Sequence, residues 1–204
     1  MLFDESYNEI KSTGKGLYKE RGSRFVAYAH PAYTTKDVSE KLLWLKKKEK
    51  SASHYCYAYV LNPDKSVIKT NDDGEPKSTA GKPILTQIKK NNLTNSLVVV
   101  VRYFGGTKLG IPGLIRAYKN ASISAIQNAT IINKKIKEQY EIEFNYLKMN
   151  NIMGVIKKYN LEIQTKIIGE NCVLLVNVLK IKSGNFLSCL NQEKNIRVVY
   201  KKLI

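Results

Sequence analysis

The chain has 204 residues, of which 43% are hydrophobic, enough to bury a core and to exclude a wholly disordered protein. Lysine and arginine total 34 against 17 acidic residues, a net charge of +17, which either favours a polyanionic partner or reflects a biased base composition of the genome. The longest apolar run, residues 97–101, is too short to span a bilayer, and the N-terminus lacks the pattern of a secretory signal, so we expect a cytoplasmic protein with no membrane partner.

The three cysteines, Cys56, Cys172 and Cys189, are widely spaced and form no CxxC pair. A structural zinc site or a disulfide framework requires paired or regularly spaced cysteines. We therefore expect ordinary buried or half-buried thiols, and neither a metal nor a cofactor.

The first predicted elements alternate between strands and a helix. Residues 7–19 suggest a short strand near a bend, and residues 23–30 alternate as a strand. A helix is predicted over residues 36–50, with Thr34 or Thr35 as its cap. The lysine run at its end either complements the helix dipole or contacts RNA.

A second strand is predicted over residues 54–61, with Tyr55, Tyr57 and Tyr59 alternating on one face. Such a row either forms a stacking platform for single-stranded RNA or lies beneath a helix. After an irregular stretch, residues 83–90 favour a short helix.

A glycine-rich loop lies between a buried strand and a long helix. The β-branched run at residues 97–101 predicts a strand that is covered on both faces. The loop at residues 105–113 leads into a helix over residues 112–129, with Leu114 and Ile115 expected to face inward.

Residues 133–137 form a polar connector, so the predicted domains are residues 1–136 and residues 137–204. The second follows the order βαββαβ, which is the ferredoxin-like plan. The predicted fold class is therefore α+β with two domains. The first domain carries 23 basic and 11 acidic residues, a net charge of +12, so a polyanion footprint is expected there.

The glycine-rich loop has two open interpretations. Glycines before a helix let an anion approach backbone N–H groups, but the loop lacks both GxxxxGK[ST] and GxGxxG. Either it is a tight turn that needs positive φ at Gly105 or Gly106, or it binds an anion. The candidate binding residues, for an anion, RNA or a protein partner, are Arg102, Tyr103, Gly105, Gly106, Lys108 and Arg116.

The acidic stretch at residues 72–76 looks like a metal loop, but an EF-hand would need ligands where Lys69 and Ala80 stand. Its carboxylates either serve as acid and base with a histidine or form turns and pair with arginines. His54 and Cys56 should lie about 6–7 Å apart along a strand, too far for a nucleophilic pair. The residues of this possible site are Asp72, Asp73, Glu75 and His54.

Four stretches, in their order and spacing, resemble the YigZ/IMPACT family. They are SRFVA at residues 23–27, ASHYCYA at 52–58, DDGEP to TAGKP at 72–83 and RYFGG to GLIRAY at 102–118. The resemblance covers roughly residues 15–130. The chain departs from the family at Lys77-Ser78, where Ser-Gly is usual, and at Ile111-Pro112, where Ala-Gly is typical.

The resemblance implies a two-layer α/β N-terminal domain with a left-handed βαβ unit, as in a small-subunit ribosomal protein and in domain IV of elongation factor G. It implies that the C-terminal domain is similar to domain V of that factor. It also implies a link to translation, because eukaryotic relatives regulate translation by competing for a scaffold protein that activates a kinase.

We therefore expect a non-enzymatic regulator of translation or of a stress response. It should bind RNA, the ribosome or a translation-regulatory protein through its basic N-terminal domain, and it has no motif specific for DNA. The alternative is a hydrolase that uses Asp72, Asp73 and Glu75 with His54.

Overall fold

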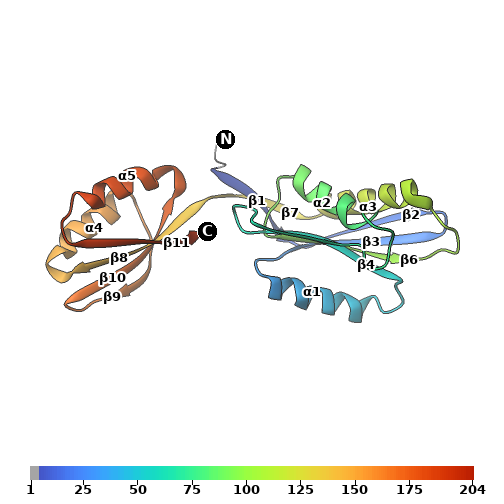
Figure 1. The fold of residues 1–204 in the computed structure, drawn as a ribbon, viewed down its shortest axis with the longest axis horizontal. Helices are drawn as coiled ribbons and strands as arrows, with labels where there is room; N and C mark the ends of the chain where they lie inside the picture. Colours follow the sequence, from blue (N-terminus) through green and yellow to red (C-terminus); the bar gives the residue numbers. More distant parts are fainter. Residues whose placement is uncertain (1–4) are drawn as a thin grey trace. The chain divides into compact units, whose positions relative to one another are not determined.

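The computed structural model describes residues 5–204; residues 1–4, which belong to the segment read for a signal sequence, lie outside it. Contacts between residues divide the chain into two compact units (Figure 1). The N-terminal unit comprises Tyr7–Lys134, and the C-terminal unit is built mainly from residues 135–204. The domain boundary after residue 136 stays a prediction.

A five-stranded antiparallel sheet forms the centre of the N-terminal unit. Its strands lie in the order β2 (Gly14–Glu20), β3 (Ser23–Pro31), β6 (Ser96–Tyr103), β4 (His54–Leu61) and β5 (Val67–Asn71). The middle strand β6 is buried on both faces, as its β-branched run predicts.

Helices cover both faces of this sheet. They are α1 (Thr35–Lys48), α2 (Gly81–Lys90) and α3 (Gly110–Gln127). Val99 packs in one hydrophobic cluster with Leu45 of α1, whereas its neighbour Val100 packs in another with Ile84 of α2 and Ala117 of α3. Figure 1 accordingly shows α1 on the opposite side of the sheet from α2 and α3. The unit thus has three layers, and the expected two-layer arrangement is wrong.

Two crossovers connect parallel strands of this sheet. One runs from β3 through α1 to β4, and the other from β5 through α2 back to β6. The second crossover differs from the first in three ways. Its first strand, β5, runs antiparallel to β3, and its path from β5 to β6 crosses the sheet in the direction opposite to the path from β3 to β4. Its helix, α2, packs on the face of the sheet opposite to α1. The two crossovers therefore have opposite handedness, so one of them is left-handed and breaks the usual rule.

Helix α1 begins with a capping box, in which Thr34 accepts a hydrogen bond from the backbone of Asp37 and Asp37 accepts one in return. The helix covers the face of β4 that carries Tyr55, Tyr57 and Tyr59, and these rings pack in or against its cluster. The tyrosine row therefore lies beneath a helix and is not an open stacking platform.

The ends of the N-terminal unit pair with each other. Strands β1 (Ser6–Ser12) and β7 (Thr130–Lys135) form a two-stranded sheet. Residues 133–137, the expected connector, contain the end of β7 and the start of β8, and the division between the two units falls within them. Residues 7–19 contain two strands and not one. The polar segment thus forms strands by pairing with distant partners while it joins the two units.

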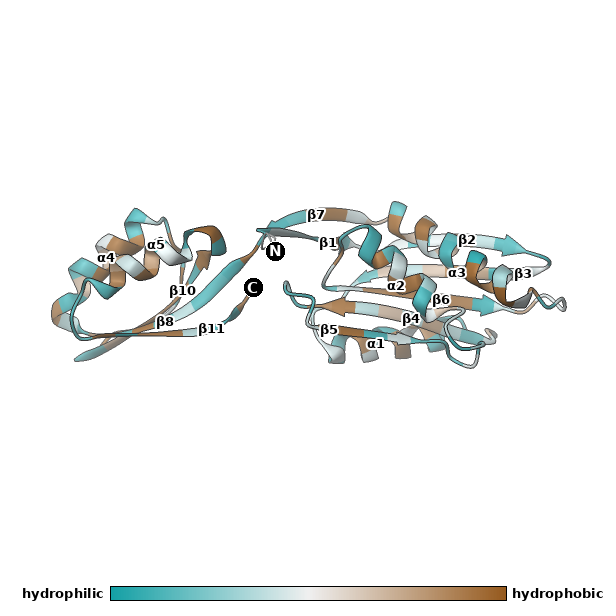
Figure 2. Cartoon of the chain, turned by 45° about the horizontal axis from the view of Figure 1, so that its top comes forward, coloured by the Kyte–Doolittle hydropathy of each residue, from teal (hydrophilic) through white to brown (hydrophobic). Residues whose placement is uncertain are grey.

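The C-terminal unit has the predicted order βαββαβ. Its elements are β8 (Lys137–Asn145), a short 3-10 helix (Tyr146–Lys148), α4 (Met149–Lys158), β9 (Ile163–Ile167), β10 (Asn171–Leu179), α5 (Lys180–Asn191) and β11 (Ile196–Leu203). The four strands pair antiparallel in the order β11-β8-β10-β9. Helices α4 and α5 carry both apolar and polar residues, as Figure 2 shows.

The cysteines are free thiols, and the helices are short or polar. Cys56 and Cys172 are buried free thiols and Cys189 is a half-buried one, which confirms the expectation. Within residues 5–204, no helix is both long and apolar enough to cross a membrane.

His30 gives the N-terminal unit a specific dependence on pH. Burial, with smaller contributions from Lys41 and Lys48, lowers the pKa of His30 from 6.5 to about 4. Between these values the unfolded chain binds a proton that the folded chain does not, so the free energy of unfolding falls as the pH drops.

We predict that His30→Phe removes this dependence. When the pH falls from about 7 to about 4, the free energy of unfolding of the wild-type protein should decrease by up to about 3 kcal/mol more than that of the variant. The two proteins share every other titrating group, so the difference reports on His30. Urea unfolding at the two pH values measures the difference. Equal losses in the two proteins would show that His30 is not held neutral by burial.

Candidate functional site

Polar residues of the family-like stretches meet inside the N-terminal unit. Arg102 of β6 is only 5% exposed, and its Nη1 lies 2.6 Å from Oε1 of Glu75. Tyr118 of α3 donates its hydroxyl to the same oxygen at 2.7 Å. A buried charge is tolerated only when it is paired and hydrogen-bonded. Arg102 is therefore a structural partner of Glu75 and not a surface cation, which corrects its expected place in an anion site.

The acidic loop uses its other carboxylates to hold its own backbone. Asp72 accepts hydrogen bonds at 2.8–3.0 Å from the N–H groups of Ser78, Ala80 and Gly81, where α2 begins. Asp73 accepts one at 2.6 Å from the backbone of Tyr55. The carboxylates thus form the turn, and Glu75 is the one that pairs with an arginine.

His54 and Cys56 have different partners, as their spacing predicts. Nδ1 of His54 donates to the carbonyl oxygen of Asp73 at 2.8 Å, and Nε2 lies 4.0 Å from Oε1 of Glu75. Cys56 is fully buried, its Sγ lies 3.0 Å from the carbonyl oxygen of Asp72, and burial raises the pKa of its thiol. This arrangement contains no activated nucleophile, so the hydrolase hypothesis is not favoured.

The glycine-rich loop packs against the turn between β2 and β3. A Cβ on Gly105 would overlap backbone atoms of Gly22 and Ser23, and the Gly105 N–H already donates to Oγ of Ser23 at 3.1 Å. Gly106 has φ of +84°, as expected for a tight turn. The loop therefore uses its glycines for close packing and chain reversal.

The other expected aromatic and charged binding residues have different partners from Arg102. The guanidinium of Arg24 lies over the ring of Tyr103, 4.3 Å from its centroid, and the Tyr103 hydroxyl donates to Glu49. Arg116 is exposed and pairs with Glu20, lowering the pKa of that carboxyl. Lys108 is exposed on the loop. Of the expected cations, Arg102 is thus withdrawn from the surface and Arg116 is paired, whereas Lys108 stays an exposed candidate.

A different cationic surface lies between α2 and α3. It is a groove of about 550 Å³, called here the α2–α3 groove. Its exposed lysines are Lys77, Lys82, Lys90 and Lys119, and its apolar lining includes Pro83, Ile111 and Ile115. Among the described residues, no acidic side chain lines the groove and none forms an ion pair with these lysines.

Sequence reasoning missed this groove, although the sequence contains a signal for it. Lys82 and Lys90 lie eight positions apart on α2, and Ile111, Ile115 and Lys119 recur every four positions on α3. Residues at this spacing share a helix face. Ile115 is 40% exposed, so its expected inward orientation is wrong.

We predict that Arg102→Met destabilises the protein by about 3–5 kcal/mol, because it leaves the Glu75 carboxylate buried without its counter-charge. Arg116→Met removes an exposed pair and should have a far smaller effect. Urea unfolding of both variants tests this. A similar small loss in each would mean that the buried pair is not needed for folding.

We also predict that Gly105→Ala costs at least about 3 kcal/mol, because the methyl group meets backbone that cannot move aside. Gly106→Ala, which has open space but positive φ, should cost about 1 kcal/mol. Thermal unfolding ranks the two variants, and the reverse order would contradict the packing role of Gly105.

Comparison with known proteins places the chain in one family. Residues 21–126 match the family model described as the Impact N-terminal domain. The chain is 33% identical over 153 residues to IMPACT family member YvyE of Bacillus subtilis, covering 75% of this chain and 70% of that protein. It is 30% identical over 186 residues to an IMPACT family member of Haemophilus influenzae, with 89% of each chain covered.

Two further similarities agree with this. The chain is 36% identical over 107 residues to IMPACT family member YigZ of Escherichia coli, covering 52% of each. A solved structure described as that of a hypothetical protein has the same fold, with a TM-score of 0.74, 23% identity and 98% of both chains covered. The chain belongs to the YigZ/IMPACT family.

Proposed function

We infer that this chain is a non-enzymatic regulator of translation, which binds structured RNA, such as ribosomal RNA, through the α2–α3 groove. The observation that supports this is the groove itself, in which four exposed lysines surround an apolar lining without an acidic neighbour among the described residues. Ammonium groups so arranged are available to phosphates, which dominate the affinity of RNA-binding proteins.

The shape and lining of the groove also suit RNA. Its lysines come from α2, α3 and the loop before α2, so they border the groove instead of lying on one helix. Ile111 is 58% exposed and Ile115 40% exposed, which provides apolar contact for ribose and base edges between the phosphates. The translational role rests on the resemblance to the family, whose eukaryotic members regulate translation.

We predict that Lys82→Gln combined with Lys119→Gln weakens the binding of a fluorescent ribosomal RNA hairpin. Each lysine that contacts a phosphate releases a counterion, so the slope of log affinity against log salt should fall by about two. Fluorescence anisotropy between about 50 and 200 mM salt measures both effects.

The matched control is Lys36→Gln combined with Lys47→Gln, which removes the same charge from α1 on the other face of the sheet. This control should bind RNA nearly as well as the wild type. An equal loss of RNA affinity in the two double variants would mean that RNA binds elsewhere, or that binding depends only on the net charge of the chain. RNA binding that is absent, or insensitive to salt, would contradict the proposal.

Capture from a lysate, with and without nuclease, separates RNA from a protein partner. If the α2–α3 groove binds RNA, nuclease should release the captured ribosomal material. Retention of a protein after nuclease treatment, lost in the Lys82 and Lys119 variant, would instead assign the groove to a translation-regulatory protein.

A further inference from the structure

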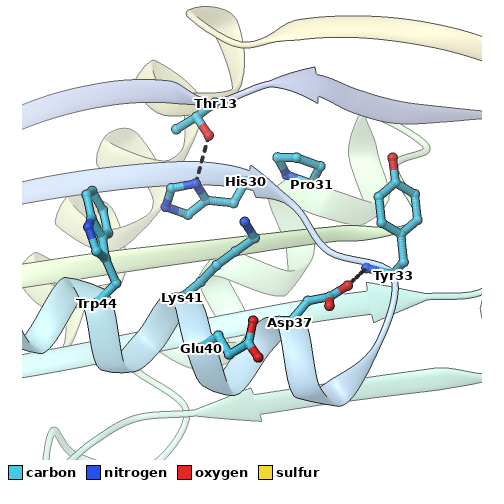
Figure 3. Close-up of a pocket in the computed structure, with 8 residues that line it drawn as sticks. All are labelled: Thr13, His30, Pro31, Tyr33, Asp37, Glu40, Lys41 and Trp44. Carbon is cyan, nitrogen blue, oxygen red and sulfur yellow. Dashed lines mark hydrogen bonds between the residues drawn. The ribbon is translucent and has the colours of Figure 1, made fainter.

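A second pocket lies beside α1, on the opposite face of the sheet from the α2–α3 groove. Its volume is about 580 Å³ (Figure 3). The side chains that matter for its chemistry are Thr13, His30, Asp37, Glu40, Lys41 and Trp44. No lining residue belongs to the α2–α3 groove, so the pocket is independent of the proposed RNA contact.

His30 presents an unpaired nitrogen to this pocket. The side chain belongs to a residue that is only 6% exposed, and its Nδ1 lies 2.8 Å from Oγ1 of Thr13. Its Nε2 is buried and has no hydrogen-bond partner. Figure 3 shows this second nitrogen facing the space between Trp44 and Lys41. Buried polar atoms are almost always paired, so this nitrogen is available to form a hydrogen bond with a molecule that enters the pocket.

The imidazole is set up as a neutral hydrogen-bonding group. Burial, with Lys41 and Lys48 nearby, lowers the pKa of His30 to about 4, so the ring is uncharged at neutral pH. When the Thr13 hydroxyl donates to Nδ1, the proton of the ring lies on Nε2. The pocket then offers one N–H donor at its base.

An aromatic surface and a cation flank this donor. Trp44 is 49% exposed, and its ring lies 6.3 Å from the His30 ring at 84°. Lys41 is half-buried and has no ion pair among the described residues. Nζ of Lys48 lies over the Trp44 ring, 4.4 Å from its centroid, so a planar ligand ring would stack on the part of the indole that Lys48 does not cover. The ammonium of Lys41 can bind a phosphate.

The acids at this pocket limit what it accepts. Asp37 is already bound to the backbone N–H groups of Tyr33 and Thr34, which leaves Glu40 as the available carboxylate. A carboxylate repels a bare anion but accepts hydrogen bonds from hydroxyl groups. A ligand with a ring, hydroxyls and one phosphate group fits this set better than inorganic phosphate.

We propose that the pocket beside α1 binds a nucleotide. Its base lies against Trp44 and accepts a hydrogen bond from Nε2 of His30, its ribose hydroxyls face Glu40 and its phosphate lies at Lys41. The same chemistry belongs to a free nucleoside monophosphate and to an unpaired nucleotide of single-stranded RNA, so the experiment has to separate these sources.

Trp44 is the only tryptophan of the chain, so its fluorescence reports on this pocket directly. The full-length protein is titrated at neutral pH with AMP, GMP, CMP and UMP, then with adenosine, inorganic phosphate and a short single-stranded RNA. Free tryptophan amide under the same conditions corrects for absorption by the ligand. Saturable quenching by at least one nucleotide is expected, and none by phosphate.

Two variants test the assigned contacts. His30→Phe keeps a ring beside Trp44 but lacks the donor, and it should weaken nucleotide binding about tenfold. Lys41→Gln, at a half-buried position, should remove the preference for AMP over adenosine while leaving adenosine binding unchanged. Circular dichroism confirms that each variant is folded, and Lys47→Gln serves as a charge control on the same helix.

Saturable quenching by mononucleotides that depends on His30 supports a free nucleotide as the ligand. Quenching by RNA alone, with the same dependence, supports an unpaired nucleotide of a strand. Quenching by inorganic phosphate alone, equal responses in wild type and His30→Phe, or no saturable response to any nucleotide would overturn the proposal.

Discussion

The Glu75 carboxylate joins three elements of the N-terminal unit, because Arg102 of β6 and Tyr118 of α3 both donate to its Oε1 atom. A charge so deeply buried needs partners that are fixed in place. The loop that carries Glu75 is held by its own carboxylates, since Asp72 and Asp73 accept hydrogen bonds from backbone N–H groups around it. The acidic loop, the sheet and α3 are therefore parts of one polar network, and the residues that characterise the family-like stretches are largely the ones that build it.

This network separates the residues that shape the protein from those available to a partner. Arg102 and Glu75 neutralise each other inside the unit, so they contribute nothing to the outward positive charge. The outward positive charge beside α3 includes Lys108 on the loop and the lysines of the α2–α3 groove. Lys77 and Ile111 both line this groove. The groove is therefore a cationic hollow next to the family-like stretches, at the two places where the sequence departs from the pattern that the resemblance implies.

Much of the fold could be predicted from the sequence, because its signals are local. The strand around residues 97–101, the cap at Thr34 and the βαββαβ order all follow from periodicity, capping chemistry and turn residues. The burial of the Arg102 side chain could not be predicted. A strand that is buried on both faces shows no alternation of polar and apolar residues, so the sequence does not indicate which side chains face solvent. The pairing of β1 with β7 depends on a partner more than a hundred residues away, and the position of α1 on the far face depends on the whole sheet. The α2–α3 groove combines two helices, so no single window of sequence contains it.

We infer that the lysines of the α2–α3 groove, and not the net charge of the chain, bind RNA. The most direct measurement is acetylation of lysines in the presence and absence of a ribosomal RNA hairpin, read by mass spectrometry at each lysine. The account predicts protection of Lys82, Lys90 and Lys119, with Lys36 and Lys47 on α1 reacting equally in both states. Protection spread evenly over all exposed lysines, or confined to α1, would contradict it.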